Sequence, residues 1–241
     1  MPSPKKGTPA LEIEDQGDRT LIIRLGDRIH PDIGRRCLAV ADALRQAGLP
    51  GVVDIVPSYT AVAVQYMPTA QEDTPTFSSL SESIRNLIGQ IPAQTAGNTR
   101  EVEIPVCYGG KHGPDLEAVA KHCGLTPQEV IEIHTAPGSM VYMLGFAPGH
   151  PYIGLLDERL NVPRKDVPRT SVPPGSVATA NRQTAIYPNV LPGGWSILGA
   201  TPLKLFDVSR TPSPALLQPG DRVRFVPISD SEFERLREAQ S

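Results

Sequence analysis

The sequence predicts an α+β protein, with an N-terminal two-layer α+β domain followed by a β-barrel domain. Three observations support this fold class. In residues 10–92, strand and helix patterns follow the order β-β-α-β-β-α, typical of helices on one face of an antiparallel sheet. A polar stretch with Gly predicts a linker at 93–100. From 101 to 229, short strand patterns recur between turn residues, which predicts a closed or nearly closed barrel. Residues 1–9 are predicted to be a flexible tail, and residues 230–241 a polar C-terminal tail.

The elements of the first domain follow from local patterns. Apolar and polar residues alternate at the start of segment 11–26, which predicts two strands around a turn. Apolar residues at helical spacing then predict a helix that Gly48 ends. Two more strands are expected on either side of Pro57. A second helix is predicted with Ser79 and Glu82 as its capping box.

The second domain is predicted to begin with a strand over 101–109 and to continue with two short helices. Pro114 is expected to open the first helix. The second has Thr126 as N-cap and Glu129 to complete a capping box. A strand is expected in SMVYMLGFA, and shorter ones in GSVATA, QTAIY, GWSILG, LKLFD and DRVRFVPI.

Composition indicates a globular protein and argues against several kinds of partner. Hydrophobic residues make up 39% and charged residues 20%, unlike a disordered chain. A net charge of −3 is not that of a nucleic-acid-binding protein. We see neither a signal peptide nor an apolar run of the ~20 residues that a membrane span needs. Cys37, Cys107 and Cys123 form no CxxC pair, so we expect free thiols in a cytoplasmic protein.

Common nucleotide, hydrolase and metal motifs are missing from the sequence. It contains no GxxxxGK[ST], GxGxxG, HExxH or GxSxG. The spacing of five possible ligands matches no standard zinc pattern, so no metal is predicted. These five are Cys107, His112, His122, Cys123 and His134.

Positive charge concentrates in residues 159–182, where one acid, Asp166, accompanies five cations. Guanidinium groups near Gly-rich turns can form a pocket for a carboxylate or a phosphate. The alternative is a solvated barrel rim, in which these cations pair with neighbouring acids. The cations are Arg159, Arg164, Lys165, Arg169 and Arg182.

The stretch GSVATANRQTAIYPNVLPGGW contains side chains that can recognise a small polar ligand. Gln183, Thr184, Tyr187 and Trp195 supply an amide, a hydroxyl, a phenol and an indole. The alternative is that Tyr187 and Trp195 belong to the hydrophobic core.

Several long motifs resemble one family. GVVDIVPSY, VYMLGFAPGHPYIGLLDERLNVPRKDVPRTSVPPGSVA, QTAIYP and LPGGWSILGATPLKLFD are similar in order and content to the family of the prokaryotic 5-oxoprolinase B subunit. This family is also called the allophanate hydrolase subunit 1 family or the kinase-A-inhibitor family. The resemblance covers nearly the whole chain and is densest over 101–228.

The resemblance implies a fold and an activity. The C-terminal barrel is expected to be cyclophilin-like. The chain is expected to be a non-autonomous subunit that, together with the A and C subunits, opens 5-oxo-L-proline to L-glutamate. ATP is the implied co-substrate. The resemblance does not assign the ATP site to one of the three subunits. The implied partners are those two subunits and a small lactam or amide substrate, without nucleic acid or membrane. Alternatives are a regulatory protein that inhibits a sensor histidine kinase, or a subunit of an allophanate-type amide hydrolase.

Residues at matching positions are expected to surround the ligand. No nucleophile or general base is obvious, so no catalytic residue is assigned. The resemblance implies contact with the ligand for Tyr152, Arg164, Arg169, Gln183 and Tyr187, and a lining of His150, Gly193, Gly194 and Trp195.

Five positions depart from the family pattern and concern the substrate more than the fold. They are His150, Leu155, Asn181, Arg182 and Ala185, most of them where the family has Gly. His150 stands where the family has an aromatic residue. We therefore interpret it as a substituted aromatic at the pocket rim, and expect His150→Phe to keep most of the activity.

Overall fold

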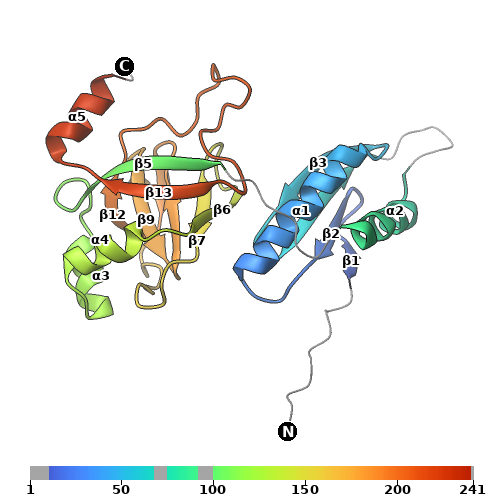
Figure 1. The fold of residues 1–241 in the computed structure, drawn as a ribbon, viewed down its shortest axis with the longest axis horizontal. Helices are drawn as coiled ribbons and strands as arrows, with labels where there is room; N and C mark the ends of the chain where they lie inside the picture. Colours follow the sequence, from blue (N-terminus) through green and yellow to red (C-terminus); the bar gives the residue numbers. More distant parts are fainter. Residues whose placement is uncertain (1–10, 68–74, 92–99, 240–241) are drawn as a thin grey trace, which may run out of the picture. The chain divides into compact units, whose positions relative to one another are not determined.

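The computed structural model describes residues 11–67, 75–91 and 100–239, which form two compact units (Figure 1). The units comprise residues 1–97 and 98–241. The predicted flexible tail at 1–9 lies outside the described residues, as does the predicted linker except for Arg100. In the described parts, no helix has the length and apolarity that a membrane span requires.

The first unit contains a four-stranded antiparallel sheet with the order β1-β2-β4-β3. Alternate residues of these strands, such as Leu21 and Ile23, are fully buried and pack against apolar side chains of both helices. The predicted order β-β-α-β-β-α is therefore confirmed. The strands are β1 (Glu12–Asp15), β2 (Thr20–Arg24), β3 (Val52–Pro57) and β4 (Ala61–Tyr66), and the helices are α1 (Pro31–Ala47) and α2 (Phe77–Gln90).

The helix ends of this unit show one correct and one incorrect prediction. Gly48 ends α1 in the left-handed conformation, as expected. Helix α2 begins one turn before the predicted Ser79–Glu82 box, because Thr76 is the N-cap. The Ser79 amide donates to Thr76 Oγ1 at 3.1 Å, and the Thr76 amide donates to Ser79 Oγ at 3.0 Å. The hydroxyl of Ser79 thus takes the place of the usual Glu in the box.

The second unit is built around a closed barrel with the strand order β10-β7-β6-β13-β5-β12-β9. The first and last of these strands pair with each other, which closes the barrel as predicted. Strands β13 and β5 run parallel, and the other pairs are antiparallel. The strands are β5 (Glu101–Tyr108), β6 (Ser139–Leu144), β7 (Pro151–Gly154), β9 (Ser176–Ala180), β10 (Gln183–Ile186), β12 (Ser196–Ala200) and β13 (Arg222–Pro227).

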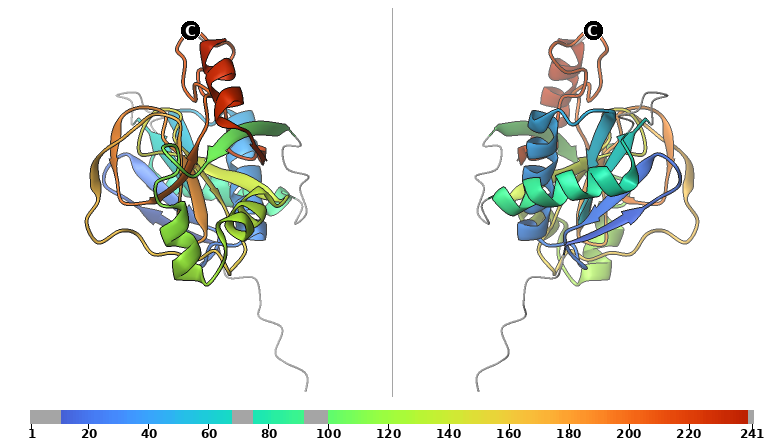
Figure 2. Two further views of the ribbon diagram at one scale, coloured as in Figure 1. Left: turned by 90° about the vertical axis from the view of Figure 1, so that its left-hand side faces the viewer. Right: turned by 90° about the vertical axis from the view of Figure 1, so that its right-hand side faces the viewer.

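Apolar side chains fill the barrel, and the same unit contains three helices. Ile104, Val177 and Ile186 are fully buried and belong to its core cluster. In the left-hand view of Figure 2, the yellow-green helices α3 and α4 lie in front of the barrel and the red helix α5 stands above it. The helices are α3 (Leu116–Cys123), α4 (Pro127–Thr135) and α5 (Asp230–Glu238). The predicted capping box of Thr126 and Glu129 is present at α4.

Several local predictions for this unit were wrong. LKLFD forms no strand and contributes only a bridge between Phe206 and Ala215. Three short strands of three or four residues had no prediction, and two of them contain Gly and Pro. These are β7 and the separate pair β8 (Arg169–Val172) and β11 (Leu191–Gly193). The predicted polar tail from 230 contains α5, because Phe233 finds an apolar site against Cys107 and Ala200.

Candidate functional site

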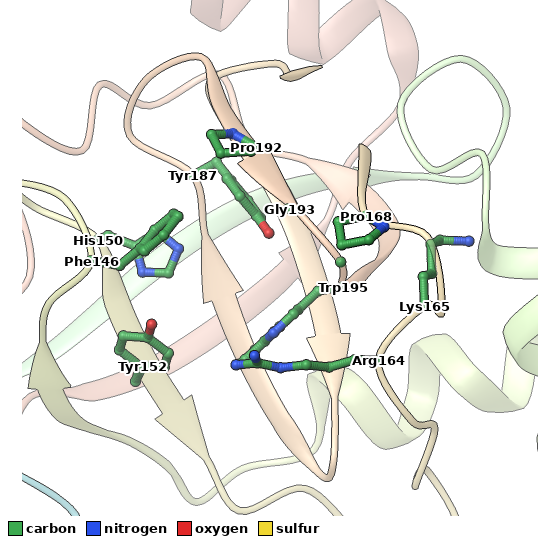
Figure 3. A pocket seen from close by; sticks show the side chains of 11 residues that line it. Phe146, His150, Tyr152, Arg164, Lys165, Pro168, Tyr187, Pro192, Gly193 and Trp195 are labelled. Atoms are coloured by element: carbon green, nitrogen blue, oxygen red, sulfur yellow. The ribbon is translucent and has the colours of Figure 1, made fainter. Parts of the chain in front are cut away.

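The second unit contains a cavity of about 300 Å³ at one side of the barrel (Figure 3). Its lining comes from the turn before β7, from β7 itself, from the segment 164–168 and from the chain between β10 and β12. This volume is at the small end of the range for ligand pockets. The lining residues are Phe146, His150, Tyr152, Arg164, Lys165, Pro168, Tyr187, Pro192, Gly193, Gly194 and Trp195.

The structure brings together seven of the nine residues predicted for the site. His150, Tyr152, Arg164, Tyr187, Gly193, Gly194 and Trp195 all line the cavity. Arg169 and Gln183 do not line it. Phe146, Pro168 and Pro192 had no prediction, although the same Gly/Pro-rich motifs contain them. The roles of all these residues stay predictions.

A tight turn places His150 and Tyr152 in the cavity wall. The His150 amide donates to the Ala147 carbonyl at 3.0 Å, and the Gly145 amide donates to the His150 carbonyl at 3.1 Å. Gly149 has φ +76°, and a Cβ there would lie 2.8 Å from the Cβ of Phe206. Only glycine fits both the conformation and the space at position 149, which explains why the turn before β7 has glycine there.

Aromatic rings form one wall of the cavity around His150. The centroid of its ring lies 5.4 Å from that of Phe146, 5.1 Å from Tyr152 and 5.3 Å from Tyr187. Tyr152 also packs edge-on against Trp195 at 5.9 Å. A flat ligand ring can pack against such a surface.

His150 is buried in this wall rather than placed at the rim. Only 3% of the residue is exposed. Loss of hydration lowers the pKa of its imidazole to about 4, with a smaller opposing effect of its own backbone. The ring is therefore neutral at physiological pH. Among the described residues, its Nδ1 has no hydrogen-bond partner.

Arg164 supplies the positive charge of the cavity. Its guanidinium carbon lies 5.8 Å from the centroid of the Trp195 ring. Figure 3 shows the two side chains next to each other. No ion pair of Arg164 is found among the described residues. Burial raises the pKa of the Tyr152 phenol, and the Arg164 charge partly opposes this effect. This guanidinium is available for a ligand carboxylate.

Asp115 holds the other two cations of this segment. Its Oδ1 accepts from Lys165 Nζ at 2.9 Å and from Arg169 Nη2 at 2.8 Å, and its Oδ2 accepts from the Ile197 amide at 2.7 Å. Burial acts to raise the pKa of Asp115, but these hydrogen bonds outweigh it and hold the pKa below the usual value. Figure 3 shows the Lys165 ammonium directed away from the cavity. Arg169 is thus held by Asp115 and does not line the cavity.

The other members of the basic cluster lie elsewhere. Arg159 forms an exposed ion pair with Asp157, and Arg182 donates to the Leu156 carbonyl at 3.0 Å. Arg159 thus fits the alternative interpretation, in which cations of the basic cluster pair with neighbouring acids at a solvated rim. Gln183 begins β10 opposite Gly154, and Thr184 bonds to the buried His134 at 3.0 Å.

Of the five departures from the family pattern, only His150 lines the cavity. Asn181 and Arg182 have φ of 50° and 63° in the turn between β9 and β10. This is the left-handed conformation that glycine adopts most readily. Ala185 is buried on β10, and Leu155 follows β7. The departures therefore reach the cavity lining only through His150.

The five possible metal ligands do not form one group. Cys107 and His112 lie with Asp230 within 4.8 Å of one another. Both the Lys111 ammonium and His112 contact Asp230 there, at 2.9 and 2.8 Å. His134 is buried between Tyr108 and Thr184. We assign no metal to these residues.

The fold and the cavity define the class of this protein. Residues 11–217 match the family model "Carboxyltransferase domain, subdomain C and D". The chain is 41% identical to the 5-oxoprolinase B subunit of Bacillus subtilis, over 96% of this chain and 98% of that protein. It is 53% identical to the 5-oxoprolinase B subunit of Escherichia coli O157:H7, over 54% of this chain and 59% of that protein. The chain therefore belongs to the family of 5-oxoprolinase B subunits.

A solved structure agrees with this fold. The crystal structure of TTHA0988 has a TM-score of 0.75 and 39% identity, and the match covers 88% of this chain. This chain spans only 40% of that longer chain.

Proposed function

We propose that this chain is the subunit of an ATP-dependent 5-oxoprolinase whose cavity binds 5-oxo-L-proline, and that it acts with two other subunits, A and C, to form L-glutamate. The observation that carries the proposal is the cavity itself. Arg164, a guanidinium without an ion-pair partner among the described residues, lies there beside an aromatic wall that includes Tyr152 and Trp195. The naming of the curated relatives supports the choice of substrate.

The geometry suits a small, flat monoanion. A ring carboxylate can pair with the Arg164 guanidinium, and the lactam ring can pack against the aromatic side chains. The cavity volume of about 300 Å³ favours a ligand of this size over a nucleotide. ATP enters the proposal as a co-substrate of the complex, and no site for it is placed on this chain.

The chemistry divides between the subunits. A lactam is an unreactive amide, and transfer of the ATP γ-phosphoryl group to its oxygen, with release of ADP, makes the ring carbon electrophilic. Water then adds to that carbon, and the C–N bond breaks as the nitrogen takes up a proton, which leaves an acyl phosphate. A second water hydrolyses this acyl phosphate to glutamate and phosphate. In the described part of this chain, the cavity lining offers an imidazole and two phenols but neither a carboxylate nor a thiol. We therefore assign binding and orientation to this chain, and the reacting groups to its partners.

The test is reconstitution. The purified chain is mixed with candidate A and C subunits, and glutamate formed from 5-oxo-L-proline and ATP is measured. We expect turnover only when all three are present. Turnover by the A and C subunits alone at the same rate, or none in the complete mixture beside an active control complex, would contradict the proposal.

A further inference from the structure

His150 is a polar group in an apolar setting, and no contact in the described parts of the chain uses the polarity of its Nδ1. The residue is 3% exposed and is surrounded by the rings of Phe146, Tyr152 and Tyr187. Its Nδ1 is buried without a hydrogen-bond partner among the described residues. A buried polar atom without a hydrogen-bond partner destabilises the folded protein. An aromatic hydrocarbon ring would pack there without this cost.

The charge state of the ring narrows its possible roles. Burial keeps the pKa near 4, so the imidazole is uncharged at neutral pH and adds no electrostatic attraction for a carboxylate. That attraction comes from Arg164, which reaches the cavity from a different segment (Figure 3). A neutral imidazole has one N–H donor and one nitrogen acceptor. It is suited to an uncharged group that both donates and accepts hydrogen bonds.

We propose that the imidazole of His150 hydrogen-bonds the ring amide of the ligand, and so distinguishes a lactam from a plain cyclic carboxylate. This inference rests on the proposed function. The secondary amide of a lactam carries one N–H and one C=O, which complement the imidazole in either tautomer. With the ligand carboxylate on Arg164, the amide of the same ring turns toward the wall that contains His150. His150 is thus a specificity-determining residue, and the sequence-based expectation for His150→Phe is reversed.

The experiment compares two ligands on the full chain by isothermal titration calorimetry. The first is 5-oxo-L-proline, and the second is cyclopentanecarboxylate, which keeps the ring and the carboxylate but has no amide. We expect the wild-type chain to prefer 5-oxo-L-proline. His150→Phe should weaken 5-oxo-L-proline binding roughly tenfold and leave cyclopentanecarboxylate unchanged.

Two further variants make the result specific. His150→Gln keeps a donor and an acceptor, so it should retain more of the preference than His150→Phe does. His122→Phe makes the same exchange at an exposed position on α3 and should change nothing. Melting curves of all variants show whether the fold is kept.

The possible failures are distinguishable. Unchanged 5-oxo-L-proline binding in His150→Phe overturns the role of His150 and leaves the proposed function standing. Equal affinity of the wild-type chain for both ligands would also overturn the role of His150 and leave the proposed function standing. A folded wild-type chain that binds neither ligand overturns the proposed function of the cavity, and this inference with it.

Discussion

At the residue scale, the charge that the cavity offers to a ligand depends on which cations already have ion-pair partners in the protein. Asp115 binds both Lys165 and Arg169, so each of these cations has an ion-pair partner within the protein. Arg164, from the same short segment, is stacked over Trp195 and keeps its hydrogen-bond donors for a ligand. Neighbours in the sequence thus have different functions, because one buried carboxylate selects between them.

Arg164→Ala is expected to weaken 5-oxo-L-proline binding about ten- to a hundredfold, the range for loss of a charge-assisted contact. The melting temperature should stay nearly constant, because no ion pair within the described residues is lost. Titration calorimetry and thermal melting measure the two effects. Arg159→Ala removes a guanidinium whose partner is the exposed Asp157, and serves as the matched control. Equal losses of affinity and stability in Arg164→Ala would make it a structural residue.

Asp115→Asn, unlike Arg164→Ala, should lower stability as well as ligand affinity. It removes the charge that holds Lys165 and Arg169, and should lower the free energy of unfolding by about 2 kcal/mol. Urea denaturation measures this. Because the segment 164–168 then loses its anchor, ligand affinity should fall as well. Asp157→Asn, at an exposed ion pair, is the control. Full stability in Asp115→Asn would show that the amide replaces the carboxylate.

At the element scale, helix α5 shows how one side chain docks a polar segment. Phe233 is the buried residue of its described range 230–238, and it packs against Cys107 and Ala200. Its ring centroid also lies 4.2 Å from that of His112. The N-terminal end of the helix adds contacts from Lys111 and His112 to Asp230. Most of the remaining α5 residues are charged, which is why the sequence pattern indicated a tail.

Phe233→Ala should therefore detach α5 from the barrel. We expect a loss of about 3 kcal/mol in the free energy of unfolding if the helix unfolds together with the barrel. If α5 opens separately, its amides will exchange rapidly while the melting temperature stays constant. Hydrogen exchange followed by mass spectrometry distinguishes the two cases. Arg237→Ala changes the exposed side of α5 and is the control. In this variant the α5 amides should exchange as slowly as in the wild type. Slow exchange over 230–238 in Phe233→Ala would contradict the docking role.

At the scale of the whole molecule, two buried histidines in the second unit make its stability depend on pH. Burial lowers the pKa of His134 to about 3 and that of His150 to about 4. In the unfolded chain, both titrate near a pKa of about 6.5. Between these values the unfolded state binds protons that the folded state does not. Stability is therefore complete above about pH 6.5 and falls as the pH decreases.

The expected loss between pH 7 and pH 5 is about 2 kcal/mol for each histidine. Urea denaturation of the chain at both pH values measures it. His150→Phe should remove about half of this dependence, whereas His122→Phe should leave it intact. The same pH dependence in His150→Phe and wild type would show that His150 is hydrated or protonated in the folded protein.

The sequence by itself determined the α+β class, the closed barrel, and the helix ends at Gly48 and Thr126. These depend on alternation, helical spacing and capping residues, which act over a few neighbouring positions. The resemblance of its motifs to one family also indicated seven of the cavity residues. The short strands β7, β8 and β11 and helix α5 were missed, because their partners lie far away in the sequence.

Only the tertiary structure decided what each side chain does at the cavity. Arg169 and Arg164 are equivalent in sequence terms, and Asp115, 54 residues before Arg169, separates their roles. His150 looked like a replaced aromatic ring until its burial was visible, together with an Nδ1 that has no partner among the described residues. Charge compensation and burial depend on contacts between residues far apart in the chain, and local sequence patterns carry no record of such contacts.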